Sequence, residues 1–166
     1  MTTTDHHRTA PGGLRRVERW AADLALSPLC VFAALVLLTS DYYMSVVLEL
    51  YDFPSAVAAA RDLAGLEPAW LFAILTILTQ ATGTVLIFAS RRWAWLGAGI
   101  LAGFTLVAAV LGHAFWAAPA EHRIETFHSF LDHLGLIGGF MLVAYWSLRP
   151  TLQDPSTRNP SFEVST

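Results

Sequence analysis

Four long stretches of apolar residues alternate with shorter polar segments along the chain. A helix that crosses a membrane needs about 20 mostly apolar residues, and each stretch reaches that length. The pattern therefore predicts an all-α membrane protein whose four transmembrane helices form an antiparallel bundle. We expect these helices at residues 24–44, 70–90, 93–113 and 130–148.

The segment between the first two spans has a helical repeat of its own. In "SAVAAARDLAGLEPAW", apolar residues recur at spacings of three and four, which is typical of a short amphipathic helix on a membrane surface. Pro54 and Ser55 can start this helix, and Gly65 and Pro68 can end it.

Both ends of the chain are polar. Residues 1–19 and 150–166 contain few apolar side chains and are broken by proline or glycine. Such segments bury too little apolar surface to fold. We predict disordered tails on either side of a membrane domain at residues 20–149.

The composition agrees with a membrane protein. The chain is 55% hydrophobic and 14% charged, whereas a soluble domain is about 25% charged. The net charge of −3 comes without a basic cluster on the scale that nucleic acid requires, so we expect no nucleic-acid partner. The single cysteine, Cys30, excludes an intrachain disulfide and a site with several cysteine ligands.

The arginines predict how the chain crosses the membrane. Eight of them lie before the first span, between the second and third spans, or after the fourth span, and only Arg61 and Arg123 lie in the other two loops. Positive residues gather on the cytoplasmic side. We therefore expect both termini in the cytoplasm, in the inner (plasma) membrane of a bacterium. The eight are Arg8, Arg15, Arg16, Arg19, Arg91, Arg92, Arg149 and Arg158.

This topology brings several ionisable residues to the outer side of the bundle. Asp41 and His113 lie late in spans that run outward, and Asp132 and His133 lie early in a span that runs inward. Ionisable groups at membrane depth are costly and mark functional sites. We predict a proton-exchanging cluster, in which the two acids orient the imidazoles or relay protons. Its members are His113, His133, Asp132 and Asp41.

A quinone headgroup would suit such a cluster. Imidazoles can bind it and exchange protons with it, and the rings of Phe115 and Trp116 could stack on it. Gln80 in the second span and His128 next to the fourth are further candidate ligands. The alternative is that each of these groups serves packing, helix capping or headgroup contacts.

Other cofactors fit the sequence less well. Two histidines at similar depth, His113 and His133, could hold a haem, but nothing else in the sequence requires one. The group His113, Glu121, His122, Glu125 and His128 matches no zinc signature, so we predict no metal site.

Glycine pairs occur at two places in the last spans. Gly99 and Gly103 are four residues apart, as are Gly135 and Gly139. Such pairs allow membrane helices to approach closely. The connection between the third and fourth spans is short, so we expect these two helices to be antiparallel neighbours.

Three stretches resemble the DoxX family of small four-helix membrane proteins. They are the segment from Gly83 through "IFASRR", the motif "HAFW" at residues 113–116, and "FLDHLGLIGGFMLV" at residues 130–143. His113 and Gly139 match the family pattern best. The family often has Lys-Asn where this chain has Asp132 and His133.

The resemblance implies two kinds of function. Some relatives form the membrane part of a thiosulfate:quinone oxidoreductase, and others look like membrane partners of thiol and superoxide defence enzymes. We therefore expect a redox-associated subunit with a quinone site, acting with a protein partner or as a homo-oligomer in the lipid bilayer. A non-catalytic scaffold or anchor for a partner protein is the alternative, and a transporter is a weaker one.

Overall fold

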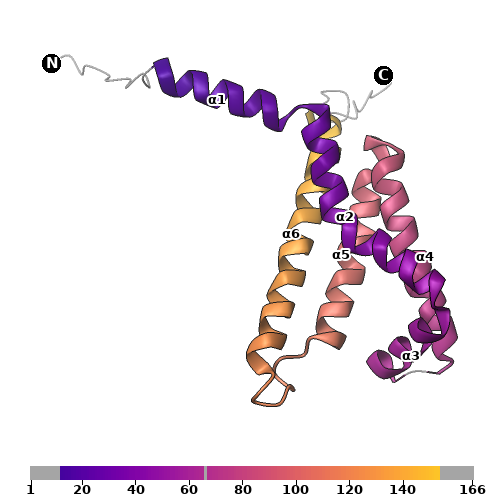
Figure 1. Ribbon diagram of the computed structural model, residues 1–166. Helices are drawn as coiled ribbons and strands as arrows, with labels where there is room; N and C mark the ends of the chain where they lie inside the picture. Colours follow the sequence, from indigo (N-terminus) through magenta and orange to yellow (C-terminus); the bar gives the residue numbers. More distant parts are fainter. Residues whose placement is uncertain (1–11, 66, 154–166) are drawn as a thin grey trace, which may run out of the picture. The chain divides into compact units, whose positions relative to one another are not determined.

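The computed structural model describes residues 12–65 and 67–153, and these residues form six α-helices and no strand (Figure 1). Four of the helices are long and apolar enough to cross a membrane, which confirms the predicted all-α fold with four spans. The chain is an integral membrane protein. The helices are α1 (Gly12–Ala25), α2 (Pro28–Tyr51), α3 (Phe53–Ala64), α4 (Ala69–Ala89), α5 (Arg91–Gly112) and α6 (Arg123–Gln153).

The chain divides after Leu37 into two compact units. The first contains α1, which begins within the segment that the sequence predicts to be a tail. Apolar Val17, Trp20 and Leu24 recur along α1 at spacings of three and four, and that spacing gives the helix an apolar face. The remainder of the predicted tails, residues 1–11 and 154–166, lies outside the described residues.

Helix α2 begins and ends later in the sequence than its predicted window. The hydroxyl of Ser27 accepts a hydrogen bond from the Cys30 N–H (3.2 Å), and Pro28 occupies the first helical position, where its missing N–H costs nothing. The helix continues to Tyr51 because apolar residues follow Asp41 for two further turns. Asp41 therefore lies near the middle of the helix, about 10 Å deeper than expected.

The short helix predicted between the first two spans is confirmed as α3. Asp52 caps its start by accepting hydrogen bonds from the N–H (3.2 Å) and hydroxyl (2.6 Å) of Ser55. Gly65 ends it in the left-handed conformation (φ 61°), which glycine adopts at little cost, and donates to the Arg61 carbonyl. In the second unit, α3 packs on α4.

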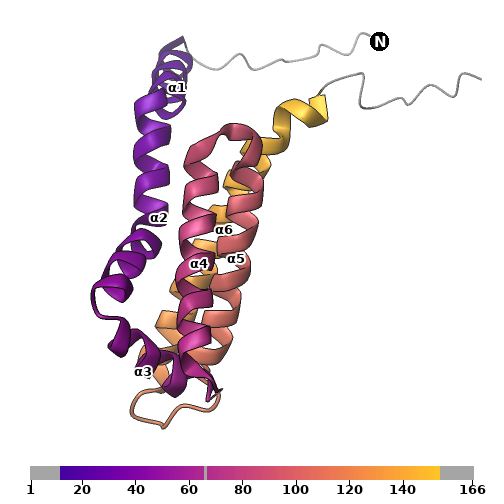
Figure 2. The same cartoon turned by 90° about the vertical axis from the view of Figure 1, so that its right-hand side faces the viewer.

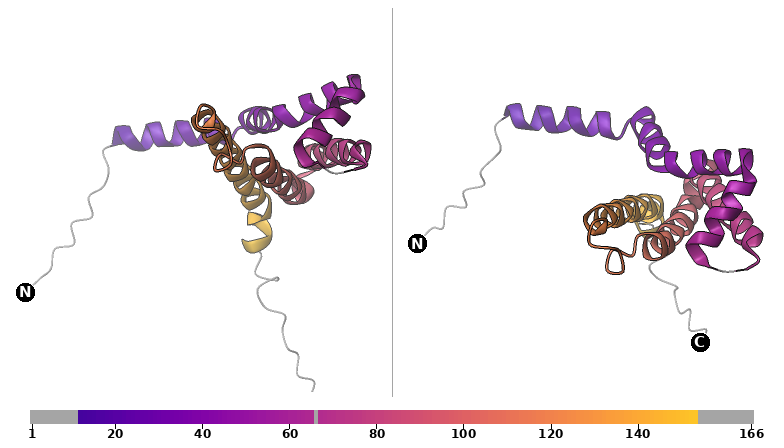
Figure 3. Two further views of the ribbon diagram at one scale, coloured as in Figure 1. Left: turned by 90° about the horizontal axis from the view of Figure 1, so that it is seen from below. Right: turned by 60° about the horizontal axis from the view of Figure 1, so that its bottom comes forward.

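Helices α4, α5 and α6 pack as consecutive neighbours. The views in Figures 2 and 3 show α5 lying between α4 and α6. Only Ser90 separates α4 from α5, so these two helices form a tight antiparallel hairpin. The expectation that the third and fourth spans are neighbours is confirmed by the α5–α6 packing.

The closest contact between two helix backbones lies at a different glycine pair from those predicted. A Cβ atom at Gly97 in α5 would lie 2.5 Å from the carbonyl oxygen of Gly83 in α4. Of the predicted glycines, Gly139 has a close neighbour, because a Cβ there would lie 2.8 Å from Cδ1 of Leu38 in α2. The prediction is wrong for the other three, where a Cβ would meet nothing within 4 Å, because the spacing of glycines does not show which face of a helix is buried. These three are Gly99, Gly103 and Gly135.

Helix α6 continues through Pro150, and α5 compensates for this proline. Proline has no N–H, so the carbonyl of Trp146, four residues earlier, lacks its helical donor. The guanidinium of Arg91 donates to that carbonyl (2.9 Å) and lies 4.2 Å from the centre of the Trp146 ring. The Ser147 hydroxyl donates to the Arg91 carbonyl.

The interior of the second unit contains a complete polar contact. The hydroxyls of Tyr42 in α2 and Thr105 in α5 lie 2.5 Å apart, and Thr105 donates to the Leu101 carbonyl (2.6 Å). Phe104 and Phe140 pack edge-on against the Tyr42 ring. This buried cluster ties the second half of α2 to α5 and α6.

Candidate functional site

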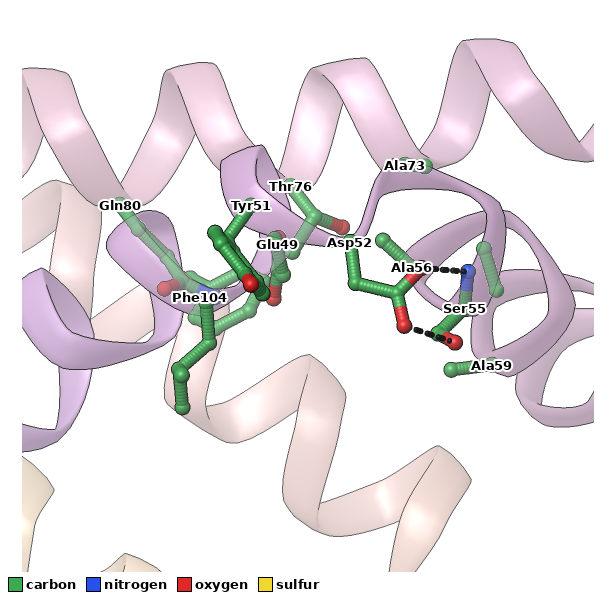
Figure 4. A pocket seen from close by; sticks show the side chains of 12 residues that line it. Glu49, Tyr51, Asp52, Ser55, Ala56, Ala59, Ala73, Thr76, Gln80 and Phe104 are labelled. Atoms are coloured by element: carbon green, nitrogen blue, oxygen red, sulfur yellow. Dashed lines mark hydrogen bonds between the residues drawn. The ribbon is translucent and has the colours of Figure 1, made fainter.

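A cavity of about 620 Å³ lies where the end of α2 meets α3 and α4, with Phe104 of α5 on its wall (Figure 4). This volume suits an organic ligand. The alanines of α3 make much of the wall apolar. Its polar side chains come from α2, the start of α3 and α4. They are Glu49, Tyr51, Asp52, Ser55, Thr76 and Gln80.

Gln80 lies at one end of this cavity without a complete set of partners. Its side chain is 4% exposed, and within the described part of the chain its Oε1 has no hydrogen-bond donor. A buried polar atom without a partner costs about 1–3 kcal/mol. Folding tolerates this cost where a bound molecule supplies the missing hydrogen bond.

Glu49 has a second buried oxygen that lacks a hydrogen-bond donor among the described residues. Its Oε1 accepts a hydrogen bond from the Ser45 hydroxyl (2.7 Å), one turn earlier in α2. Its Oε2 is buried and has no donor among the residues that the structure describes. The neighbouring Asp52 differs, because hydrogen bonds from Ser55 occupy its carboxylate and lower its pKa.

A smaller cavity of about 50 Å³ shares Gln80 and Phe104 with the large one. Asp41, Thr105 and His133 also line it. This volume is enough for a water molecule, and the walls supply polar groups that could bind one. Gln80 thus stands between the large cavity and a polar space that reaches His133.

His113 and His133 lie side by side at the junction of α5 and α6. Their ring centres are 4.6 Å apart, so the prediction that they meet across these helices is confirmed. His133 Nδ1 donates to the Ser129 carbonyl (2.7 Å), and this leaves Nε2 of the neutral ring free to accept a proton. Partial burial, and then the nearby His133, lower the pKa of His113.

A third cavity of about 240 Å³ continues from the large one between α4 and α5. It shares Ala60, Thr76 and Phe104 with the large cavity, and its walls extend to Phe72 and Leu111. These walls are largely apolar. The two cavities together offer a polar end at Gln80 and an apolar extension beside Phe104.

The remaining sequence-predicted residues do not face the large cavity. Asp132 and His128 are exposed on α6. The ring of Phe115 packs edge-on against Trp116, Phe127 and Phe130, so its faces are occupied within an aromatic cluster. Trp116 packs against Phe115 and Phe130 in the same cluster. Asp41 is exposed overall but reaches the small cavity.

The sequence analysis missed Glu49 because it ended the first span at residue 44. The apolar run nevertheless continues through Leu50, and Ser45 stands four residues before Glu49. That spacing places a hydroxyl and a carboxylate on one helix face. Apolar residues on both sides of Glu49 indicate that it lies within the span, and this pattern could have identified it as a candidate.

Comparisons of the chain with protein-family models, with curated proteins and with solved structures find no match. The resemblance to the DoxX family stays a prediction.

Proposed function

We propose that this chain is a DoxX-like integral membrane subunit that binds a quinone and exchanges protons with it, while a partner protein carries the electrons. One observation carries the proposal. The large cavity ends at the buried side chain of Gln80, whose Oε1 has no donor among the described residues, and Gln80 also borders the small cavity that reaches His133.

The shape and lining of the cavities support a quinone as the ligand. A quinone has a flat ring with polar atoms at its edge and a long apolar chain. The ring fits the 620 Å³ cavity beside Phe104, with one polar edge at Gln80. The apolar chain fits the 240 Å³ extension between α4 and α5.

The histidines supply a route for protons. A water molecule in the small cavity would link Gln80 to Nε2 of His133, and His133 lies against His113. His113 follows the last residue of α5 and is only partly buried, so it can pass a proton to the water outside. Because the rings are 4.6 Å apart, a proton on one disfavours a proton on the other.

The proposed orientation follows from the arginines of the sequence. With both termini in the cytoplasm of a bacterium and the chain in its inner membrane, the histidine pair lies on the outer side. The proton route then opens to that side.

The proposal is tested by measuring bound quinone. The purified chain in lipid nanodiscs should yield stoichiometric quinone on extraction with organic solvent. Gln80→Leu should lower the quinone affinity by about tenfold or more. His113→Ala should keep the quinone but slow proton-coupled turnover with the partner. Thr82→Val, an exposed position on the same helix, serves as the matched control.

The scaffold alternative makes a different prediction for the same proteins. If the chain carries no quinone, takes up none from quinone-loaded nanodiscs, and still captures its partner after Gln80→Leu, the quinone proposal is wrong. Partner binding that depends on the loops or tails would then identify a scaffold.

A further inference from the structure

The two unpartnered oxygens at the large cavity are both hydrogen-bond acceptors. Glu49 Oε2 approaches from α2 and Gln80 Oε1 from α4, and both are buried. Figure 4 shows these side chains among those that line the cavity. The cavity therefore lacks donors for two of its own atoms, and a ligand that brings donors would complete it.

We infer that the cavity selects the reduced, hydroxyl-bearing quinol over the oxidised quinone, with Glu49 and Gln80 accepting hydrogen bonds from its hydroxyl groups. This inference rests on the proposed function and specifies its substrate. A quinone ring carries carbonyl oxygens, which only accept hydrogen bonds. A quinol ring carries hydroxyls at opposite ends, which donate them.

The buried Glu49 oxygen favours the quinol, although the cavity wall also carries donors. These donors are the amide N–H groups of Gln80 and the hydroxyls of Tyr51 and Thr76, and no arginine, lysine, histidine or tryptophan side chain lines the cavity within the described chain. The Ser55 hydroxyl already donates to Asp52. A quinone carbonyl near Glu49 would face an acceptor without gaining a donor, and the Glu49 oxygen would remain unpartnered.

The positions of the two acceptors also fit a ligand with two hydroxyls. Glu49 belongs to α2 and Gln80 to α4, so a ring with a hydroxyl at each end can donate to both helices. Phe104 lies on the wall beside Gln80 and offers an aromatic surface for that ring. A long-chain amine would also donate hydrogen bonds, but its single polar end leaves one of the acceptors unpartnered.

The experiment compares three short-chain ligands under anaerobic conditions in nanodiscs that hold the full chain. These are the quinol, the matching quinone, and the quinol with both hydroxyls methylated. We expect the quinol to bind about tenfold more tightly than the quinone. The methylated compound should bind no better than the quinone, because it has the same ring and chain but no donor.

Two variants assign the preference to named residues. Glu49→Leu should bring the quinol-to-quinone affinity ratio close to one without weakening quinone binding. If that variant does not fold, Ser45→Ala with Glu49→Gln retains a polar helix face and should still lower the ratio. Asp62→Asn removes an exposed acid of α3 that does not line the cavity, and should leave the ratio unchanged.

The outcomes separate this inference from the proposed function. Equal binding of quinol and quinone overturns the preference and leaves the quinone site in place. Binding of neither compound overturns both. Displacement of bound quinol by a long-chain amine at equal concentration also overturns the preference, because the acceptors would then serve an organic cation.

Discussion

The two halves of the α4–α5 hairpin differ in how closely their helices approach. Next to Ser90, Gly83 and Gly97 bring the two backbones into contact, and no side chain separates them. Farther along, Thr76 and Gln80 of α4 and Phe104 of α5 line the cavities. Both halves are apolar in sequence. The comparison shows that glycine at one facing pair brings the two helices into contact, whereas the larger residues farther along leave a cavity beside them.

The polar atoms of the interior differ in the same way. The hydroxyls of Tyr42 and Thr105 satisfy each other in the packed interior, and Thr105 also reaches the Leu101 carbonyl. Gln80 and Glu49, at the large cavity, each keep an oxygen without a donor. The satisfied pair stabilises the fold, and the two unsatisfied oxygens are the groups on which the proposed ligand site rests.

The largest effect on stability should follow from a larger side chain at the glycine contact between α4 and α5. In Gly97→Val, the new side chain would collide with the Gly83 carbonyl and with backbone of Ile87, so the helices must separate. We expect a loss of about 3 kcal/mol or more in the free energy of unfolding, measured by circular dichroism in detergent. Gly99→Val, two residues away in open space, should cost less than about 1 kcal/mol. Equal losses would show that the glycine contact does not hold the hairpin.

A substitution at the cavity should have the opposite effect on stability. Gln80→Leu removes a buried polar atom that has no partner, so the stability of the ligand-free chain should stay the same or rise. Quinone affinity should fall by about tenfold or more. Thermal unfolding and quinone extraction measure the two effects. A clear loss of stability without ligand would mean that Gln80 has a structural partner.

Removing the buried hydrogen bond between Tyr42 and Thr105 should have a moderate effect on stability. Tyr42→Phe keeps the buried ring but removes its hydroxyl, so Thr105 loses one partner. We expect a loss of about 1 kcal/mol in the free energy of unfolding. The variant should bind quinone normally, since Tyr42 does not line the large cavity. A stability equal to that of the wild type would contradict the role given to this contact.

The smallest effect should be a pH dependence at the histidine pair. The pKa of His113 lies below its ordinary value of about 6.5 because the ring is partly buried and His133 is close. The unfolded chain therefore binds more protons between these two pKa values, so stability should fall as the pH drops from about 7. His113→Gln should reduce this fall, as measured by unfolding temperatures at several pH values. A variant that loses stability as steeply as the wild type would assign the effect to other groups.

The sequence predicted the presence of the helices better than the residues at which they begin and end. The end of α3 at Gly65 and its start close to Pro54 follow local rules of backbone conformation, and both were predicted, although the capping residue Asp52 was not. The end of α2 was not, because a hydropathy window stops at a charged residue such as Asp41 although the helix continues. Because of this error, Asp41 was placed near the end of the helix, and Glu49 was placed in a loop.

The site could be predicted only in part for a related reason. His113 and His133 follow from topology, since adjacent antiparallel helices bring their nearest ends together. The large cavity depends on α3 packing on α4 and on the side of α4 that Gln80 faces. Neither is encoded in the spacing of polar residues, because both result from packing between separate helices.

Ser90 alone connects α4 to α5, and this shortness bears on how the chain is made. A span released alone into lipid would leave the next span at the mouth of the insertion channel, tethered by one residue. We therefore expect the two spans to enter the bilayer as a pair, in contact at Gly83 and Gly97. The hairpin would then be a unit onto which α6, synthesised later, docks.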